Sequence, residues 1–182
     1  MEIAAELFAE RGYKATTVRD IAEASGLLSG SLYHHFESKE SIIDELLSSY
    51  LDELIATCEE IVSGDIGPKE KFTRLIAAAF WSLREHKAAI TVLQNERQQL
   101  IALERFSYLR QREARVRKMW LAVIEDGMRH GVFRDDLDPD VVYRFTRDVI
   151  WVTVRWYRPD GRLTPDELAG QYVSMILDGL AS

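Results

Sequence analysis

The segment from Val18 to Phe36, VRDIAEASGLLSGSLYHHF, constrains the fold more than any other part of the chain. It places Ala22, Gly26 and Leu32 at offsets of four and six residues. An alanine lets two helices cross closely, a glycine adopts the left-handed conformation of a tight helix exit, and a leucine fixes the second helix to an apolar core. The pattern therefore predicts two short helices joined by a tight turn, a helix-turn-helix.

Helical patterns continue on both sides of this segment. A first helix with one apolar face ends near Gly12, and Thr17 with Asp20 has the spacing of a capping box. Ser38 is suited to cap a long fourth helix, and Pro68 to begin a fifth. Further helical patterns cover residues 69–86, 88–102, 105–130, 140–157 and 165–180. With almost no alternating β-branched runs, the sequence predicts an all-α fold of about nine helices.

The second short helix has the size of a helix that enters the major groove, while the preceding one contacts the backbone. Its outward side is predicted to present Ser29, Gly30, Ser31, Tyr33 and His34. Hydroxyl groups bond phosphate oxygens, and a glycine lets the backbones approach closely. Thr17 and Lys39, which flank the two helices, add expected phosphate contacts. The spacing alone also fits a helical hairpin with no role in DNA binding.

The charge of the chain opposes this interpretation. The net charge is −7, and residues 1–50 contain four Lys or Arg against nine Asp or Glu. Nucleic-acid-binding domains usually carry a basic patch. Any DNA contact must therefore depend on the placement of individual side chains and helix ends.

Composition and motifs exclude several other classes of protein. No apolar run reaches the ~20 residues of a membrane span, and the N-terminus lacks the pattern of a secretory signal. The single cysteine, Cys58, cannot form an internal disulfide, so we expect a structural thiol in a cytoplasmic protein. Motifs of hydrolases, phosphate loops and metal sites are absent, so we expect neither an enzyme nor a cofactor.

The run TTVRDIAEASGLLSGSLYHHFESKESI resembles the N-terminal signature of TetR-family repressors, over residues 7–46. The resemblance implies that Thr17, Tyr33, His34 and Lys39 grip the DNA backbone and that residues 28–31 help to read bases. Leu28 stands where most members have a serine cap, which favours apolar contact with a thymine methyl. Members also carry a longer basic N-terminal segment, so we expect residues to be missing here.

The segment 140–157 is the most informative part of the remaining chain. On a helical projection its apolar residues occupy roughly 220° of the circumference, which predicts burial on several sides. The remaining sector places Arg147, Trp151 and Arg155 four residues apart. Asp148 is expected to pair with Arg144, which leaves the other cations less compensated.

This sector is a candidate ligand site. A guanidinium binds phosphate or carboxylate and an indole stacks on a planar group, so Arg147 and Trp151 are the first candidates. Arg112 and Arg105, from the segment 105–130, are further candidates, together with Arg155. The alternative is that the sector faces solvent or forms salt bridges at an interface.

A second, narrower resemblance concerns RKMW (117–120) and DVVYRFTRDVIWVTVRWYRPDGRLT (140–164). These stretches look like the actinobacterial TetR-type repressors of steroid (cholesterol) ring degradation, which are released from DNA by a CoA thioester. The resemblance implies that Arg147 and Trp151 contact the CoA moiety.

Together these features predict a repressor with a helix-turn-helix domain at residues 1–46 and an effector-binding and dimerisation domain at 47–182. A homodimer joined mainly through the last two helices is expected to bind a palindromic operator and to release it when the inducer binds. The alternatives are a repressor that responds to a drug or a fatty acyl-CoA, and a helical adaptor that binds no operator.

Overall fold

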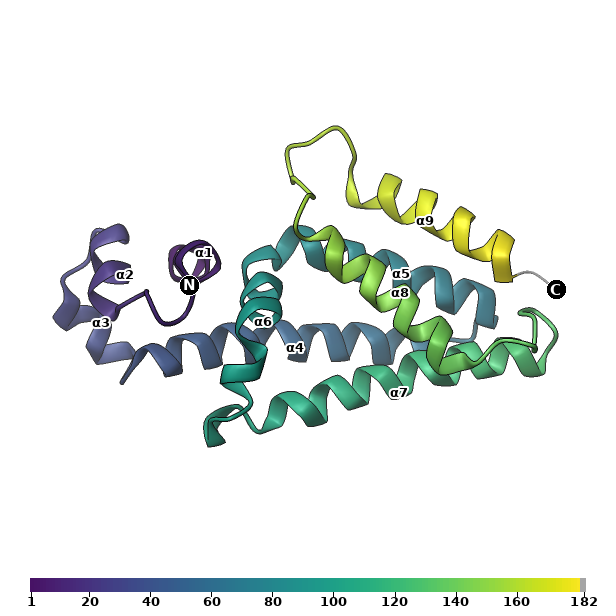
Figure 1. Cartoon of the computed structure of the whole chain (residues 1–182), viewed down its shortest axis with the longest axis horizontal. Helices are drawn as coiled ribbons and strands as arrows, with labels where there is room; N and C mark the ends of the chain where they lie inside the picture. The colour runs from purple at the N-terminus through teal and green to yellow at the C-terminus, as the bar shows by residue number, and fades with distance from the viewer. Residues whose placement is uncertain (181–182) are drawn as a thin grey trace. The chain divides into compact units, whose positions relative to one another are not determined.

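The computed structural model describes residues 1–180, apart from the side chains of Ser29 and Leu180, and contains nine α-helices and no β-strand in that range (Figure 1). The all-α prediction is confirmed. The helices are α1 (Glu2–Arg11), α2 (Val18–Ala24), α3 (Ser29–His35), α4 (Lys39–Ser63), α5 (Pro68–Glu85), α6 (Lys87–Leu100), α7 (Tyr108–Arg129), α8 (Pro139–Thr153) and α9 (Pro165–Leu180). A short 3-10 helix, η1 (Glu104–Phe106), precedes α7.

The chain divides into two compact units. The first contains Met1–Asp52 and His86–Arg110, and the second contains Glu53–Glu85 and the residues from Gln111 on. Helix α6 belongs to the first unit because it packs against α1. The compact units therefore differ from the predicted functional ranges, 1–46 and 47–182, and the assignment of DNA and effector binding to those ranges stays a prediction.

The capping box before α2 and the glycine turn after it form as the sequence predicts. The Thr17 hydroxyl accepts the Asp20 N–H at 3.1 Å, while the Asp20 carboxylate accepts the Thr17 N–H at 2.8 Å, which completes the capping box. Gly26 has a φ of +66°, the left-handed conformation that ends α2. Ala22 and Leu32 are buried where α2 packs against α3. The predicted turn is thus confirmed.

An aromatic cluster forms the core of the second unit. The Phe72 ring of α5 lies 5.9 Å from Trp120 of α7 and 5.4 Å from Phe133, and Trp120 lies 6.2 Å from Tyr143 of α8. Helix α5 also packs against α8 and α9.

Cys58 is buried, and burial raises the pKa of its thiol to about 11, as expected of a structural thiol that stays protonated at neutral pH.

Helix α8 is shorter than the sequence predicts. It ends at Thr153 rather than near residue 157, and the chain then turns, with the Tyr157 N–H donating to the Thr153 carbonyl at 2.8 Å. The apolar period continues into this turn because Val154 and Tyr157 are buried without being helical. Arg155 therefore lies beyond the helix and does not continue the spacing of Arg147 and Trp151.

The predicted burial of this helix on several sides is also wrong for the single chain. Its buried face consists of Val142, Tyr143, Thr146, Ile150 and Thr153. A second face is apolar but exposed, and we call it the apolar stripe: Val141, Phe145, Val149 and Val152.

Neither α8 nor any other described helix is long and apolar enough to cross a membrane.

Gly127 of α7 tests the packing of the second unit. A Cβ at this position would lie 2.2 Å from the fully buried Phe133 ring. Gly127→Ala is expected to lower the free energy of unfolding by about 1–3 kcal/mol, because the ring must move. Urea unfolding measures the change. Gly30→Ala is the control, since a Cβ there meets no atom within 4 Å, and equal midpoints for the two variants would contradict the packing.

Candidate functional site

Four of the residues predicted to contact DNA, Gly30, Ser31, Tyr33 and His34, lie on the exposed side of α3. Tyr33 is 56% exposed, and His34 and Ser31 are exposed as well. Tyr33 and His34 are carried away from the buried Leu32, which fixes α3 to the core. Gly30 lies in open space, where no atom lies within 4 Å of a Cβ position. The helix therefore presents two hydroxyls, an imidazole and a bare backbone to the solvent.

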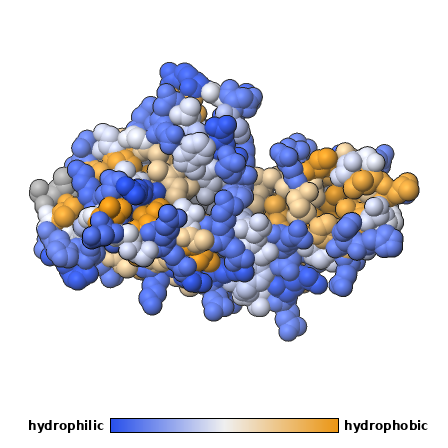
Figure 2. Space-filling model, turned by 180° about the vertical axis from the view of Figure 1, so that it is seen from behind, coloured by the Kyte–Doolittle hydropathy of each residue, from blue (hydrophilic) through white to orange (hydrophobic). Residues whose placement is uncertain are grey.

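The start of α3 is apolar. Leu28 is the N-cap residue, makes no side-chain cap, and is 84% exposed beside the half-exposed Leu27. Figure 2 shows apolar residues at the surface of the part that carries the N-terminal helices, on the right of that view. A leucine at this position can contact the methyl group of a thymine. The predicted role of the Ser29 side chain lies outside the described residues.

The Thr17 hydroxyl is already engaged. It donates to the Asp20 carboxylate at 2.6 Å, and this bond is the main cause that lowers the pKa of Asp20. To donate to a phosphate, the hydroxyl must leave Asp20. The exposed Thr17 stays a predicted DNA contact, with this exchange as its condition.

Lys39 also has a structural role. Its ammonium donates to the carbonyls of Tyr13 at 2.9 Å and Thr16 at 3.3 Å, and lies 4.3 Å from the centre of the Tyr13 ring. An ammonium has three N–H groups, so two bonds leave one for a phosphate. The predicted phosphate contact of Lys39 rests on this remaining donor.

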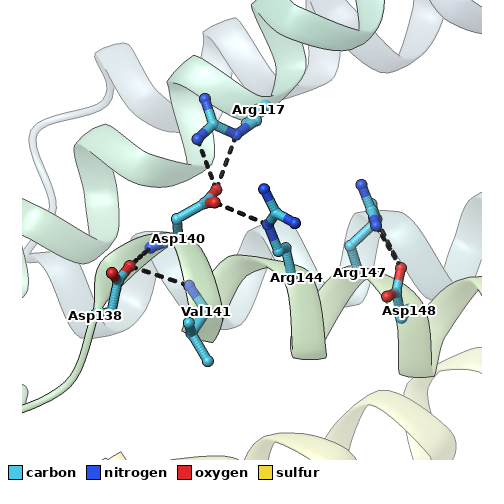
Figure 3. Close-up of polar contacts among 7 residues, drawn as sticks. All are labelled: Arg117, Asp138, Asp140, Val141, Arg144, Arg147 and Asp148. Carbon is cyan, nitrogen blue, oxygen red and sulfur yellow. Dashed lines mark hydrogen bonds and ion pairs between the residues drawn. The ribbon is translucent and has the colours of Figure 1, made fainter.

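The ion pairs of α8 differ from the expected ones (Figure 3). Asp148 accepts from Arg147, at 2.8 Å from Nε and 2.6 Å from Nη2, and not from Arg144. The Arg144 Nε donates instead to Asp140 at 2.8 Å. The other oxygen of Asp140 accepts from the Arg117 guanidinium, at 2.6 and 2.9 Å. These hydrogen bonds, with Arg117 first, lower the pKa of Asp140.

Arg147 and Trp151, the first candidates for ligand binding, lie together. The guanidinium carbon of Arg147 is 5.9 Å from the centre of the Trp151 ring and 5.7 Å from that of Tyr143. The pKa of Tyr143 is raised by burial, against the opposing effect of the nearby Arg147 charge. Arg147 thus lies between two aromatic rings with its side chain 43% exposed, an arrangement that suits a planar anionic ligand.

The other candidate cations come from other segments of the chain. Arg155 is exposed beyond the end of α8, and Arg112 is half-buried on α7 among other contacts. Arg105 belongs to the first unit, where its Nη1 lies 3.4 Å from Asp44.

Within residues 1–180, no three His, Cys, Asp or Glu side chains converge as a metal site would require.

Sequence reasoning did not identify Tyr143, Asp140 or Arg117 as neighbours of the candidate site. The signal for Asp140 was present, because Arg144 has an aspartate four residues before it and another four residues after it. Spacing could not decide between the two. Arg117 lies on another helix, so only the fold brings it to Asp140.

The sequence matches two models of one family. The model described as bacterial regulatory proteins, tetR family, matches residues 1–46, and the Tetracyclin repressor-like C-terminal domain matches residues 65–180. This chain belongs to the TetR family. The match to the N-terminal model covers the whole helix-turn-helix described above.

Similar TetR-family members are named repressors. The HTH-type transcriptional repressor KstR2 of Mycobacterium tuberculosis is 49% identical over 180 residues, which cover 99% of this chain and 90% of the relative. KstR2 of Rhodococcus jostii is 48% identical over 182 residues, 100% of this chain and 89% of the relative. The structure of the ketosteroid transcriptional regulator KstR2 of M. tuberculosis has a TM-score of 0.96, 49% identity and coverage of 100% and 92%. The protein is accordingly a TetR-type transcriptional repressor rather than an enzyme.

Tyr33 tests the DNA-binding face of this TetR-family repressor. Tyr33→Ala is expected to weaken operator binding about tenfold, because a hydrogen bond to a charged phosphate is lost. Tyr33→Phe removes only the hydroxyl and should show most of the same loss. Fluorescence anisotropy on the upstream DNA measures affinity, and light scattering checks that dimerisation is intact. Unchanged affinity in both variants would remove Tyr33 from the DNA interface.

Proposed function

We propose that this repressor binds a palindromic operator as a homodimer and releases it when an acyl-CoA from steroid catabolism binds beside α8. The observation that carries the proposal is the Arg147 guanidinium between the rings of Tyr143 and Trp151. The chain is similar to KstR2, and KstR2 of M. tuberculosis is described as a ketosteroid transcriptional regulator. This similarity supports an effector that comes from steroid catabolism.

The chemistry of a CoA thioester fits the residues assigned to the site. Its phosphates suit the guanidinium of Arg147, and its adenine can stack on the indole of Trp151. Arg112 and Arg155 are the further cations that we assign to the anionic part. A phosphate that binds Arg147 competes with Asp148, whose carboxylate holds the same guanidinium in the free chain.

The apolar stripe of α8 supports the homodimer. Phe145 is 68% exposed at its centre, and Met175 of α9 is 75% exposed. Contiguous exposed apolar side chains are unfavourable in water, and a second copy of the chain covers them without any other partner. Helical spacing puts Asp148, which accepts from Arg147, between the stripe and the face of Arg147 and Trp151, so the ligand site and the dimer contact share one helix.

Release then follows from the geometry of the dimer. Two recognition helices match a palindrome only when they lie about one DNA turn, ~34 Å, apart. A ligand that binds more tightly to a dimer with another spacing shifts the population towards that state, by no more than its difference in affinity. A drug or a fatty acyl-CoA could use the same face, and ligand preference distinguishes these effectors from the steroid-derived one.

Arg147 and Trp151 test the ligand site. Arg147→Ala or Trp151→Ala is expected to raise the inducer concentration needed for operator release at least about tenfold, because a charge-assisted bond or a stacking contact is lost. The measurement is release of labelled operator by a steroid-derived acyl-CoA. Operator affinity without inducer should stay unchanged.

Arg129→Ala is the matched control for these variants. Arg129 is an exposed arginine on α7 that pairs with Asp126, and it has no part in the proposed site. It should respond to the inducer like the wild type. A normal response in both site variants would move the ligand site away from this face.

Phe145 tests the dimer. Phe145→Glu places a charge in the middle of the apolar stripe, where a dimer would bury it without a partner. We expect light scattering to show a monomer and operator affinity to fall. Leu103→Glu, the same kind of exchange at an exposed leucine of the first unit, should remain dimeric. A dimeric Phe145→Glu variant would place the dimer contact elsewhere.

A further inference from the structure

A buried carboxylate on α6 contacts the turn that leads into the helix-turn-helix. Glu96 is 9% exposed, and its Oε1 accepts the backbone N–H of Tyr13 at 3.1 Å. The Gln99 side chain donates to the other oxygen at 2.9 Å. Tyr13 lies between α1 and α2, just before the Thr17 cap, and 83 residues from Glu96 in sequence.

Tyr13 is held from α4 as well, and we call this set of contacts the Tyr13 clamp. The Tyr13 carbonyl accepts from the Lys39 ammonium, and its hydroxyl donates to the Glu40 carboxylate. Burial, followed by the bond to Glu40, raises the pKa of the Tyr13 hydroxyl to about 12, so the tyrosine stays protonated in the clamp. Two helices, α4 and α6, therefore fix one residue of the turn through its N–H, its carbonyl and its side chain.

The glycine at position 12 leaves room for the Glu96 carboxylate. Gly12 has a φ of +83°, and a Cβ on it would lie 3.0 Å from the Glu96 Oε1. A buried carboxylate costs free energy unless hydrogen bonds satisfy it, and an apolar residue would fill the same space without that cost. The contribution of Glu96 is therefore the directed bond to Tyr13 rather than packing alone.

We propose that Glu96 is a positioning residue for operator binding, through which α6 holds the helix-turn-helix in its DNA-binding arrangement. Helix α6 lies outside residues 1–46, yet it belongs to the same compact unit. Helix α6 begins at Lys87, and the chain enters this unit at the preceding residue, His86. A displacement of the chain before His86 is therefore transmitted to the Tyr13 clamp through this one helix. The proposal rests on operator binding by the full-length repressor and needs no particular effector.

Loss of the clamp lowers operator affinity by lowering the fraction of molecules in which the helix-turn-helix is in place. Glu96→Ala removes the acceptor, and we expect operator affinity to fall about tenfold, the value of one hydrogen bond to a charged group. Glu96→Gln keeps an acceptor oxygen but loses the charge, so the expected loss is about threefold. Gln98→Ala, at an exposed position of the same helix, is the matched control and should bind like the wild type.

The experiment measures anisotropy of the full chain on its own upstream DNA and, in parallel, hydrogen exchange of the Tyr13 amide. The Tyr13 amide should exchange slowly in the wild type and faster in both Glu96 variants, which a loss of packing alone would not produce for Glu96→Gln. If Glu96→Ala does not fold, the Glu96→Gln variant gives both readouts. Wild-type affinity together with unchanged exchange in Glu96→Gln overturns the proposal, whereas failure of the wild type to bind DNA overturns operator binding itself.

Discussion

Helix α8 must satisfy three different surroundings with fifteen residues. One face is buried in the second unit, one carries the apolar stripe, and the face between them carries Arg147 and Trp151. At 3.6 residues per turn, Asp148 borders the stripe, so a ligand that replaces Asp148 on Arg147 changes the partner of a carboxylate beside the stripe. The proposed coupling between inducer and dimer geometry depends on this sharing of one rigid helix, and no separate relay between two distant sites is required.

The DNA-binding unit faces a different constraint, because its first fifty residues carry more negative than positive charge. Bulk attraction to DNA is weak in such a unit, so affinity depends on contacts that are placed accurately. Lys39 illustrates the point, since the structure commits two of its three N–H groups to the turn before α2. A clamp that fixes this turn from α4 and α6 is what a repressor needs when its first fifty residues hold only four Lys or Arg.

Local features of the fold could be predicted from the sequence, and long-range ones could not. The capping box of Thr17 and the left-handed Gly26 depend on neighbouring residues, so their spacing was sufficient. The end of α8 was wrong because apolar residues after Thr153 are buried in a turn, which periodicity cannot distinguish from a helix. The predicted partner of Asp148 was wrong because Arg144 has an aspartate four residues away on either side, and spacing could not show that it pairs with Asp140, which Arg117 of another helix also binds. Glu96 gave no sequence signal, since its partner lies 83 residues away.

The most direct test of a ligand-responsive repressor is fluorescence anisotropy of the full-length wild-type protein on its own upstream DNA. The complex is titrated in parallel with a steroid-derived acyl-CoA, with free CoA and with the free acid. We predict release by the thioester alone, because only it combines phosphates for Arg147, a stacking group for Trp151 and an apolar acyl part. Tight DNA binding that none of the three compounds disturbs would contradict the proposed effector and the role of the Arg147 face.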